Sequence, residues 1–208
     1  MTNKENYVCV IELLNFKKIS LESGKDLLQI RVDNIVNQVR KILNTLTDVS
    51  ASFVGDRVEL VINSTSNQFE KFVEMIMDYN KHALLFGIPH RAIVFKENSF
   101  RVKEENLNLN ISKEAFSMME QLEQFDLAGM LIDSSLYNER KDVFAKYTVS
   151  YNNAIVLKLS KRPIADIALQ GIKNSISNSF NKIGVNDFST QYSTILNNTL
   201  KFVDVQNV

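Results

Sequence analysis

Apolar side chains follow two different spacings in the first half of the chain, and each spacing predicts a different element. Residues 7–14 are a short β-branched and apolar run typical of a central strand. Residues 25–46 place apolar side chains three and four positions apart, which predicts a long amphipathic helix. Residues 50–63 give two short β-runs, and Gly55 and Asp56 between them predict a hairpin.

A second helix and a further strand complete this pattern. Residues 66–86 carry Phe, Val, Ile and Met on one helical face, and residues 89–95 follow as a strand that Pro89 opens. The order β-α-β-β-α-β is that of a ferredoxin-like, palm-type fold, in which an antiparallel sheet carries its helices on one face. We therefore predict an α+β fold with this core.

The second half of the chain is less regular and predicts additional strands and helices. The expected elements are a helix over 112–124, a strand over 129–136, a hairpin over 143–159 and two helices near 163–182 and 189–203. No linker and no internal repeat separates the halves. We therefore predict a single domain over residues 1–208.

Composition excludes several classes of function. The formal net charge is zero, which argues against a partner that is a long nucleic acid polymer, but a local basic pocket for a triphosphate remains compatible with it. The lone Cys9 provides neither a disulfide nor a cysteine zinc site, and we expect it to be a small core residue. His82 and His90 have no third ligand at metal spacing and are interpreted as surface or boundary residues.

No stretch is apolar for the roughly 20 residues that a membrane-spanning helix needs, so no membrane partner is expected. The first residues also lack a convincing signal-peptide cleavage site. We therefore predict a soluble cytoplasmic protein.

Glu12 is the first candidate for chemistry, because it interrupts an apolar strand where an unpaired buried charge is costly. In the predicted topology the first strand neighbours the hairpin, so Glu12 and Asp56 reach one edge of the sheet. Two such carboxylates can bind the ion of a magnesium-bound triphosphate. The turn that follows Glu12 can bind its phosphates through backbone N–H groups. The alternative is a strand-end carboxylate paired with Lys17 or Arg57, without a metal.

Three segments of the first half resemble the class III nucleotidyl cyclases. "VIELLNFKKIS" (10–20) resembles their first metal-binding strand, "FVGDRVELVI" (53–62) their Gly-Asp hairpin, and "IPHRAIVF" (88–95) the strand after their second helix. Downstream, residues 111–137 and 192–203 are similar to segments of the Pycsar-type pyrimidine nucleotide cyclases. The resemblance runs loosely over nearly the whole chain.

The resemblance implies an enzyme that converts UTP or CTP to a 3′,5′-cyclic nucleotide and pyrophosphate, as a signal in antiphage defence. It also implies two divalent cations, Mg²⁺ or Mn²⁺, and a homodimer with active sites at its interface. The residues that match the family's motif positions are Glu12, Leu13 and Asp56 for the metals, and Leu14, Asn15, Phe16, Lys17 and Arg91 for the substrate.

The sequence departs from the family's pattern at four positions. Glu12 replaces an Asp, Asn15 and Ala92 replace glycines, and Ser52 stands where many purine cyclases carry a base-reading Lys. Ser52 fits the pyrimidine branch. The departures keep two alternatives open: a catalytically degenerate cyclase fold that binds nucleotides or acts as a scaffold, and a diverged diguanylate-cyclase-like domain.

Overall fold

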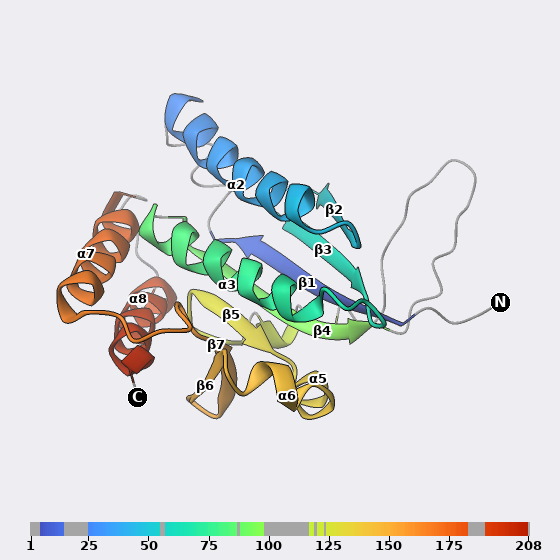
Figure 1. Ribbon diagram of the computed structural model, residues 1–208. Helices are drawn as coiled ribbons and strands as arrows, with labels where there is room; N and C mark the ends of the chain where they lie inside the picture. Colours follow the sequence, from blue (N-terminus) through green and yellow to red (C-terminus); the bar gives the residue numbers. More distant parts are fainter. Residues whose placement is uncertain are drawn as a thin grey trace.

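The computed structural model describes residues 5–14, 25–54, 57–86, 88–97, 117–118, 120–122, 124–182 and 190–207. Its centre is a seven-stranded sheet in the order β2-β3-β1-β4-β5-β7-β6 (Figure 1). The strands are β1 (Asn6–Leu13), β2 (Val49–Val54), β3 (Arg57–Asn63), β4 (His90–Glu97), β5 (Gly129–Ile132), β6 (Thr148–Tyr151) and β7 (Ala154–Leu157). The helices are α2 (Lys25–Thr45), α3 (Phe69–Leu85), α5 (Ser134–Glu139), α6 (Lys141–Phe144), α7 (Asp166–Lys182) and α8 (Thr190–Asp204), followed by the 3₁₀ turn η2 (Val205–Asn207).

The predicted β-α-β-β-α-β core is confirmed as β1-α2-β2-β3-α3-β4. Its four strands pair antiparallel, with β1 between β3 and β4, and β5 then joins β4 in parallel. The complete sheet is therefore mixed, and its first four strands have the ferredoxin-like order. The predicted α+β palm-type fold class is confirmed.

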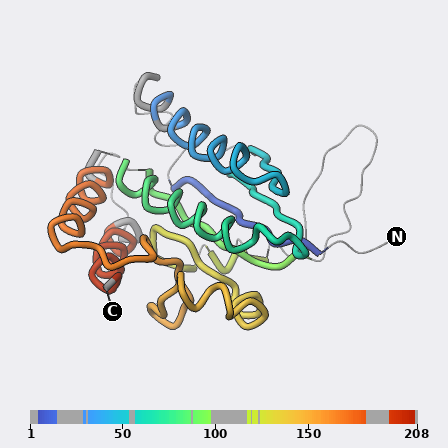
Figure 2. Tube along the Cα trace, in the orientation of Figure 1, coloured from blue at the N-terminus to red at the C-terminus, as the bar shows by residue number. Residues whose placement is uncertain are grey.

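The two faces of β1 pack into two different clusters, because successive strand residues point to opposite faces. Tyr7, Cys9 and Ile11 pack with α2 and α3, whereas Val8 and Val10 pack with side chains of α7 and α8. The helices α7 and α8 contact each other, and α7 also contacts α3 (Figures 1 and 2). Both faces of the central strand are covered over most of its length.

Cys9 is a fully buried core residue, as the sequence predicts. Burial in apolar surroundings raises the pKa of its thiol, so the side chain stays protonated and unreactive. None of the described helices is long and apolar enough to cross a membrane.

The predicted strand over 129–136 is too long, because it ends at Ile132 and α5 follows at once. The side chain of Asp133 accepts hydrogen bonds from the backbone N–H groups of Ser135 and Leu136. This is an N-cap, and Asp followed by two serines is a sequence that favours one. The predicted strand therefore ran past the start of a helix, which the Asp-Ser-Ser sequence marks.

The predicted hairpin over 143–159 begins later than expected, since Val143 and Phe144 belong to α6. Its strands pair from Thr148 to Leu157, and the turn residues Asn152 and Asn153 have φ angles of 48° and 61°. Asn tolerates this left-handed conformation better than most residues, which explains the tight turn.

The remaining helices agree with the sequence to within a few residues. The first C-terminal helix begins at Asp166 rather than near residue 163, and the second spans Thr190–Asp204. Of the helix expected over 112–124, residues 117, 118 and 120–122 are helical, residue 124 lies in a turn, and the others lie outside the described residues.

Candidate functional site

Glu12 lies near the end of β1, directly opposite an arginine on each side. The register places Arg57 of β3 and Arg91 of β4 as its cross-strand partners. Directly opposed residues of antiparallel strands point to the same face. All three side chains therefore lie on the face of Val8 and Val10, which is the face away from α2 and α3.

Each carboxylate oxygen of Glu12 faces its own guanidinium group. Arg57 Nη2 lies 3.6 Å from Glu12 Oε1, and Arg91 Nη2 lies 3.3 Å from Glu12 Oε2. The side chains of Glu12 and Arg91 are 14% and 11% exposed, whereas that of Arg57 is 42% exposed. The charge on Glu12 is thus balanced inside the sheet by Arg91 and at its surface by Arg57. The sequence offered one alternative to a metal ligand, in which Glu12 forms an ion pair with Lys17 or Arg57, and the ion pair with Arg57 is present.

Arg91 is held in place by a second contact. Its Nη1 donates a hydrogen bond of 3.2 Å to the carbonyl oxygen of Leu122, in the helical segment that precedes β5. Arg91 therefore ties the end of β1 to a segment about thirty residues further along the chain than itself. This anchoring distinguishes it from the more exposed Arg57.

The other residues predicted for this site fall into two groups. Leu13 pairs with His90 across β1 and β4, and the backbone N–H of Leu14 donates to the carbonyl oxygen of Pro89 at 3.0 Å. The amide of Leu14 is therefore engaged at the end of the sheet, and its side chain is buried. The predicted residues Asn15, Phe16, Lys17 and Asp56 lie outside the described residues.

His90 is fully buried, so its interpretation as a surface or boundary residue is wrong. Its Nδ1 lies 3.0 Å from the carbonyl oxygen of Ile88, and its Nε2 lies 3.0 Å from Oδ1 of Asn80. Desolvation lowers its pKa to about 4, so the ring is neutral near pH 7. His90 is the first residue of β4 and directly precedes Arg91. The signal in the sequence that could have indicated this burial is the position of His90 at the start of an apolar strand.

Ser52 and Glu59 extend the polar row on the same face of the sheet. They are cross-strand partners of β2 and β3, and Ser52 Oγ donates to Glu59 Oε2 at 3.2 Å. Sequence reasoning did not single out Glu59. The alternation of Arg57, Val58, Glu59 and Leu60 carries the signal, because it places both charged residues on one face.

The described residues do not fit a divalent metal ion in this arrangement. Among them, no group of three or more His, Cys, Asp or Glu side chains lies close enough together to hold one. Mg²⁺ is bound through carboxylate oxygens, and both oxygens of Glu12 already face a guanidinium group. The arrangement of Arg57 and Arg91 is instead suited to an anion such as phosphate.

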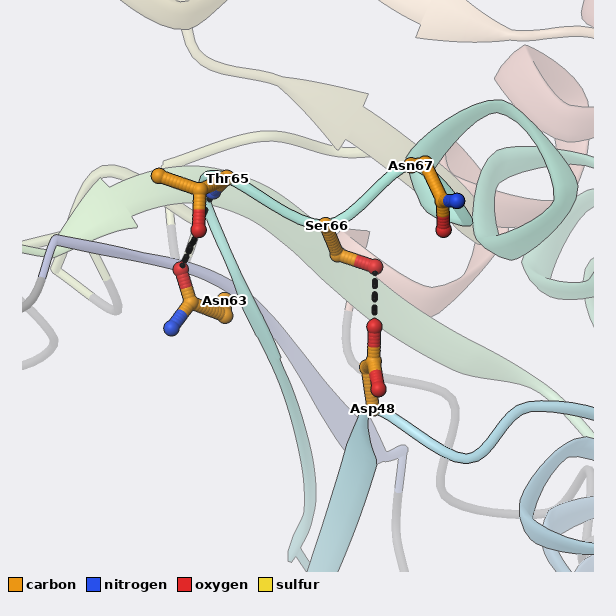
Figure 3. A pocket seen from close by; sticks show the side chains of 5 residues that line it. All are labelled: Asp48, Asn63, Thr65, Ser66 and Asn67. Carbon is orange, nitrogen blue, oxygen red and sulfur yellow. Dashed lines mark hydrogen bonds between the residues drawn. The ribbon is translucent and has the colours of Figure 1, made fainter.

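A polar hollow of about 530 Å³ lies at the far end of β3 (Figure 3). It is lined by Asp48, Asn63, Thr65, Ser66 and Asn67. Two of these residues accept hydrogen bonds from their neighbours: Ser66 Oγ donates to Asp48, and Thr65 Oγ1 donates to Asn63. The hollow is shaped by the connection between β3 and α3. It lies away from Arg57, which begins the same strand.

The fold is similar to those of two solved nucleotide cyclases. The adenylyl cyclase CyaB from P. aeruginosa matches with a TM-score of 0.55 and 17% identity, over 78% of this chain and 97% of that chain. A bacterial light-regulated adenylyl cyclase matches with a TM-score of 0.50 and 12% identity, over 85% of this chain and 98% of the other. No family model and no curated protein matches the sequence. The chain has the class III nucleotidyl cyclase fold.

Proposed function

We propose that the protein is a nucleotidyl cyclase that converts a pyrimidine nucleoside triphosphate, UTP or CTP, into a 3′,5′-cyclic nucleotide and pyrophosphate. The observation that carries this proposal is the convergence of Glu12, Arg57 and Arg91 on the central strands of a cyclase fold. The resemblance of the sequence to Pycsar-type cyclases supports the pyrimidine substrate and a role of the product as an antiphage signal.

The two arginines supply what the reaction requires from the protein's own side chains. The ribose 3′-oxygen forms a bond to the α-phosphorus and gives up its proton to solvent water, while the bond from the α-phosphorus to the bridging oxygen breaks and pyrophosphate leaves. Negative charge accumulates on that leaving group. Guanidinium groups bind phosphate oxygens in a fixed planar geometry and stabilise such charge. Arg91 is proposed for this role because Leu122 holds it in place.

Two divalent cations, Mg²⁺ or Mn²⁺, belong to the proposal, with Glu12, Leu13 and Asp56 as the residues for them. Such ions offset charge on the attacking and leaving oxygens. Both oxygens of Glu12 face a guanidinium group, so a cation would compete with Arg57 and Arg91 for this carboxylate.

Ser52 supports a pyrimidine rather than a purine as the base. Its short side chain, bonded to Glu59, replaces the lysine with which many purine cyclases read the base. We further propose that residues 1–208 form one domain and that two copies pair in the cytoplasm with their active sites at the interface. Leu14, Asn15, Phe16 and Lys17 remain the residues proposed for the triphosphate.

A second candidate function is a cyclase fold that binds a nucleotide without converting it. The double ion pair of Glu12 favours this alternative, because it neutralises the carboxylate proposed as the first metal ligand. Such a module would bind the triphosphate through Arg57 and Arg91. It would release neither pyrophosphate nor a cyclic product.

The test is to incubate the full chain with Mn²⁺ and each of the four ribonucleoside triphosphates separately. Pyrophosphate and the cyclic nucleotide are measured together, with Asp56→Asn as the inactive variant and Asp48→Asn as its matched control. Asp48 directly precedes β2 and lines the polar hollow, away from Asp56 in the sequence and from the site at Glu12. Turnover of UTP or CTP is expected. Binding of a nucleotide without turnover would favour the second candidate.

A further inference from the structure

We propose that Glu12 acts as an internal anion that closes a phosphate-binding site formed by Arg57 and Arg91. A phosphate group that enters the site would displace Glu12 from the two guanidinium groups. The proposal deepens the proposed function, since it rests on a triphosphate that binds at this end of the sheet. It adds a role for Glu12 other than metal binding.

The charges of the cluster favour an incoming anion. Two guanidinium groups surround one carboxylate, so these three side chains carry a net charge of +1, and the nearby Glu59 carboxylate on the same face accepts a hydrogen bond from Ser52. A phosphate group offers more oxygens and more negative charge than the carboxylate that it would replace. The cluster is therefore neutralised better by phosphate than by Glu12.

The distances show that Glu12 is not held in the best geometry. Hydrogen bonds between charged nitrogen and oxygen groups are shortest and strongest near 2.7–2.9 Å. The contacts of Glu12 are 3.6 Å to Arg57 and 3.3 Å to Arg91. Both contacts of Glu12 are longer than this range. A diffusible phosphate group is not tethered to β1 as Glu12 is, so it can adjust its position to both guanidinium groups.

Arg57 is the side chain through which exchange can begin. It is 42% exposed, and its Nε is buried without a hydrogen-bond partner among the described residues. An entering phosphate oxygen can accept from this group and from Nη2. Arg91 is only 11% exposed and stays bound to the Leu122 carbonyl oxygen. Arg91 therefore provides the fixed half of the site and Arg57 the half that rearranges.

The displacement of Glu12 by phosphate has a consequence for the proposed enzyme. When phosphate occupies the two arginines, both oxygens of Glu12 are released from their ion pairs. Glu12 then becomes an available carboxylate at the end of β1 only when the site holds a polyphosphate. The double ion pair is in this sense an autoinhibitory contact that the substrate itself opens.

The experiment measures the affinity of the full chain for inorganic triphosphate by calorimetry in the presence of EDTA. Glu12→Gln removes the internal competitor and is expected to bind about tenfold more tightly than the wild type, because charge pairs of this kind contribute at least that factor to binding. Arg57→Gln is expected to bind about tenfold more weakly. A role of Glu12 in metal binding alone predicts no gain in the absence of metal.

The matched control is Glu139→Gln, which removes the same charge at the opposite end of β1. Glu139 accepts hydrogen bonds from Tyr7 and Lys96 and should leave the triphosphate affinity within about twofold of the wild type. Unchanged or weaker binding by Glu12→Gln would overturn the proposal. If that variant does not fold, Arg57→Gln decides, because wild-type affinity in this variant would also overturn it. The assay requires neither metal nor turnover, so its result is independent of the cyclase assay.

Discussion

Replacing Arg91 by methionine tests whether this arginine is the buried, structural partner of Glu12. Arg91→Met keeps most of the side-chain volume and removes the guanidinium group. At 3.3 Å and an effective dielectric constant of about 20, the Coulomb attraction to Glu12 is about 5 kcal/mol. Desolvation of two side chains that are 11% and 14% exposed offsets about half of this attraction. The hydrogen bond to Leu122 adds about 1 kcal/mol.

The expected loss of unfolding free energy is therefore about 3.5 kcal/mol for Arg91→Met. Arg57→Met is the matched comparison, because its ion pair is longer and 42% exposed, and about 0.5–1 kcal/mol is expected there. Both values are measured by urea unfolding in low salt. Equal effects of the two substitutions, or a loss below about 1 kcal/mol for Arg91→Met, would refute the distinction between an inner and an outer arginine.

Three further predictions concern stability. Burial lowers the pKa of His90 to about 4, so the folded protein binds fewer protons than the unfolded chain below pH 6.5. The unfolding free energy should therefore fall by about 1.5 kcal/mol when the pH is lowered from 6.5 to 5. A His90→Gln variant should lose this pH dependence. Asp133→Ala removes the N-cap of α5 and should lower the unfolding free energy by about 1 kcal/mol, whereas Asp133→Asn, which retains a capping oxygen, should lower it less. Tyr147→Phe removes a buried hydroxyl whose single proton lies between the carboxylates of Glu70 and Glu74, and it should lower the unfolding free energy by about 1 kcal/mol; an unchanged midpoint of chemical denaturation would show that the hydroxyl contributes nothing.

The β-α-β-β-α-β core was predictable because its signals are local. Each strand and helix carries its own apolar spacing, and the ferredoxin-like order then fixes which strands are neighbours. The errors after β5 have a local cause as well. At Asp133 a helix cap directly follows a strand, and at Val143 a short helix directly precedes a hairpin. At Val143 apolar residues continue across the boundary between helix and hairpin, whereas at Asp133 the boundary is set by a side chain that caps the backbone of the next helix.

The candidate site was predictable only in part, because it depends on register. The sequence singles out Glu12 as a charge in an apolar strand, but it does not state which residues of β3 and β4 lie opposite. A shift of one residue would have turned Arg91 to the other face of the sheet. The same argument applies to His90, whose burial depends on the face that it shares with the core helices.

The proposed activity is the conversion of a pyrimidine nucleoside triphosphate to a cyclic nucleotide. The most direct measurement is chromatographic detection of the cyclic nucleotide after incubation of the full chain with Mn²⁺ and UTP or CTP. We expect a 3′,5′-cyclic pyrimidine nucleotide and an equal amount of pyrophosphate, both lost in Glu12→Gln and retained in Glu139→Gln. No cyclic product from any of the four ribonucleoside triphosphates would contradict it.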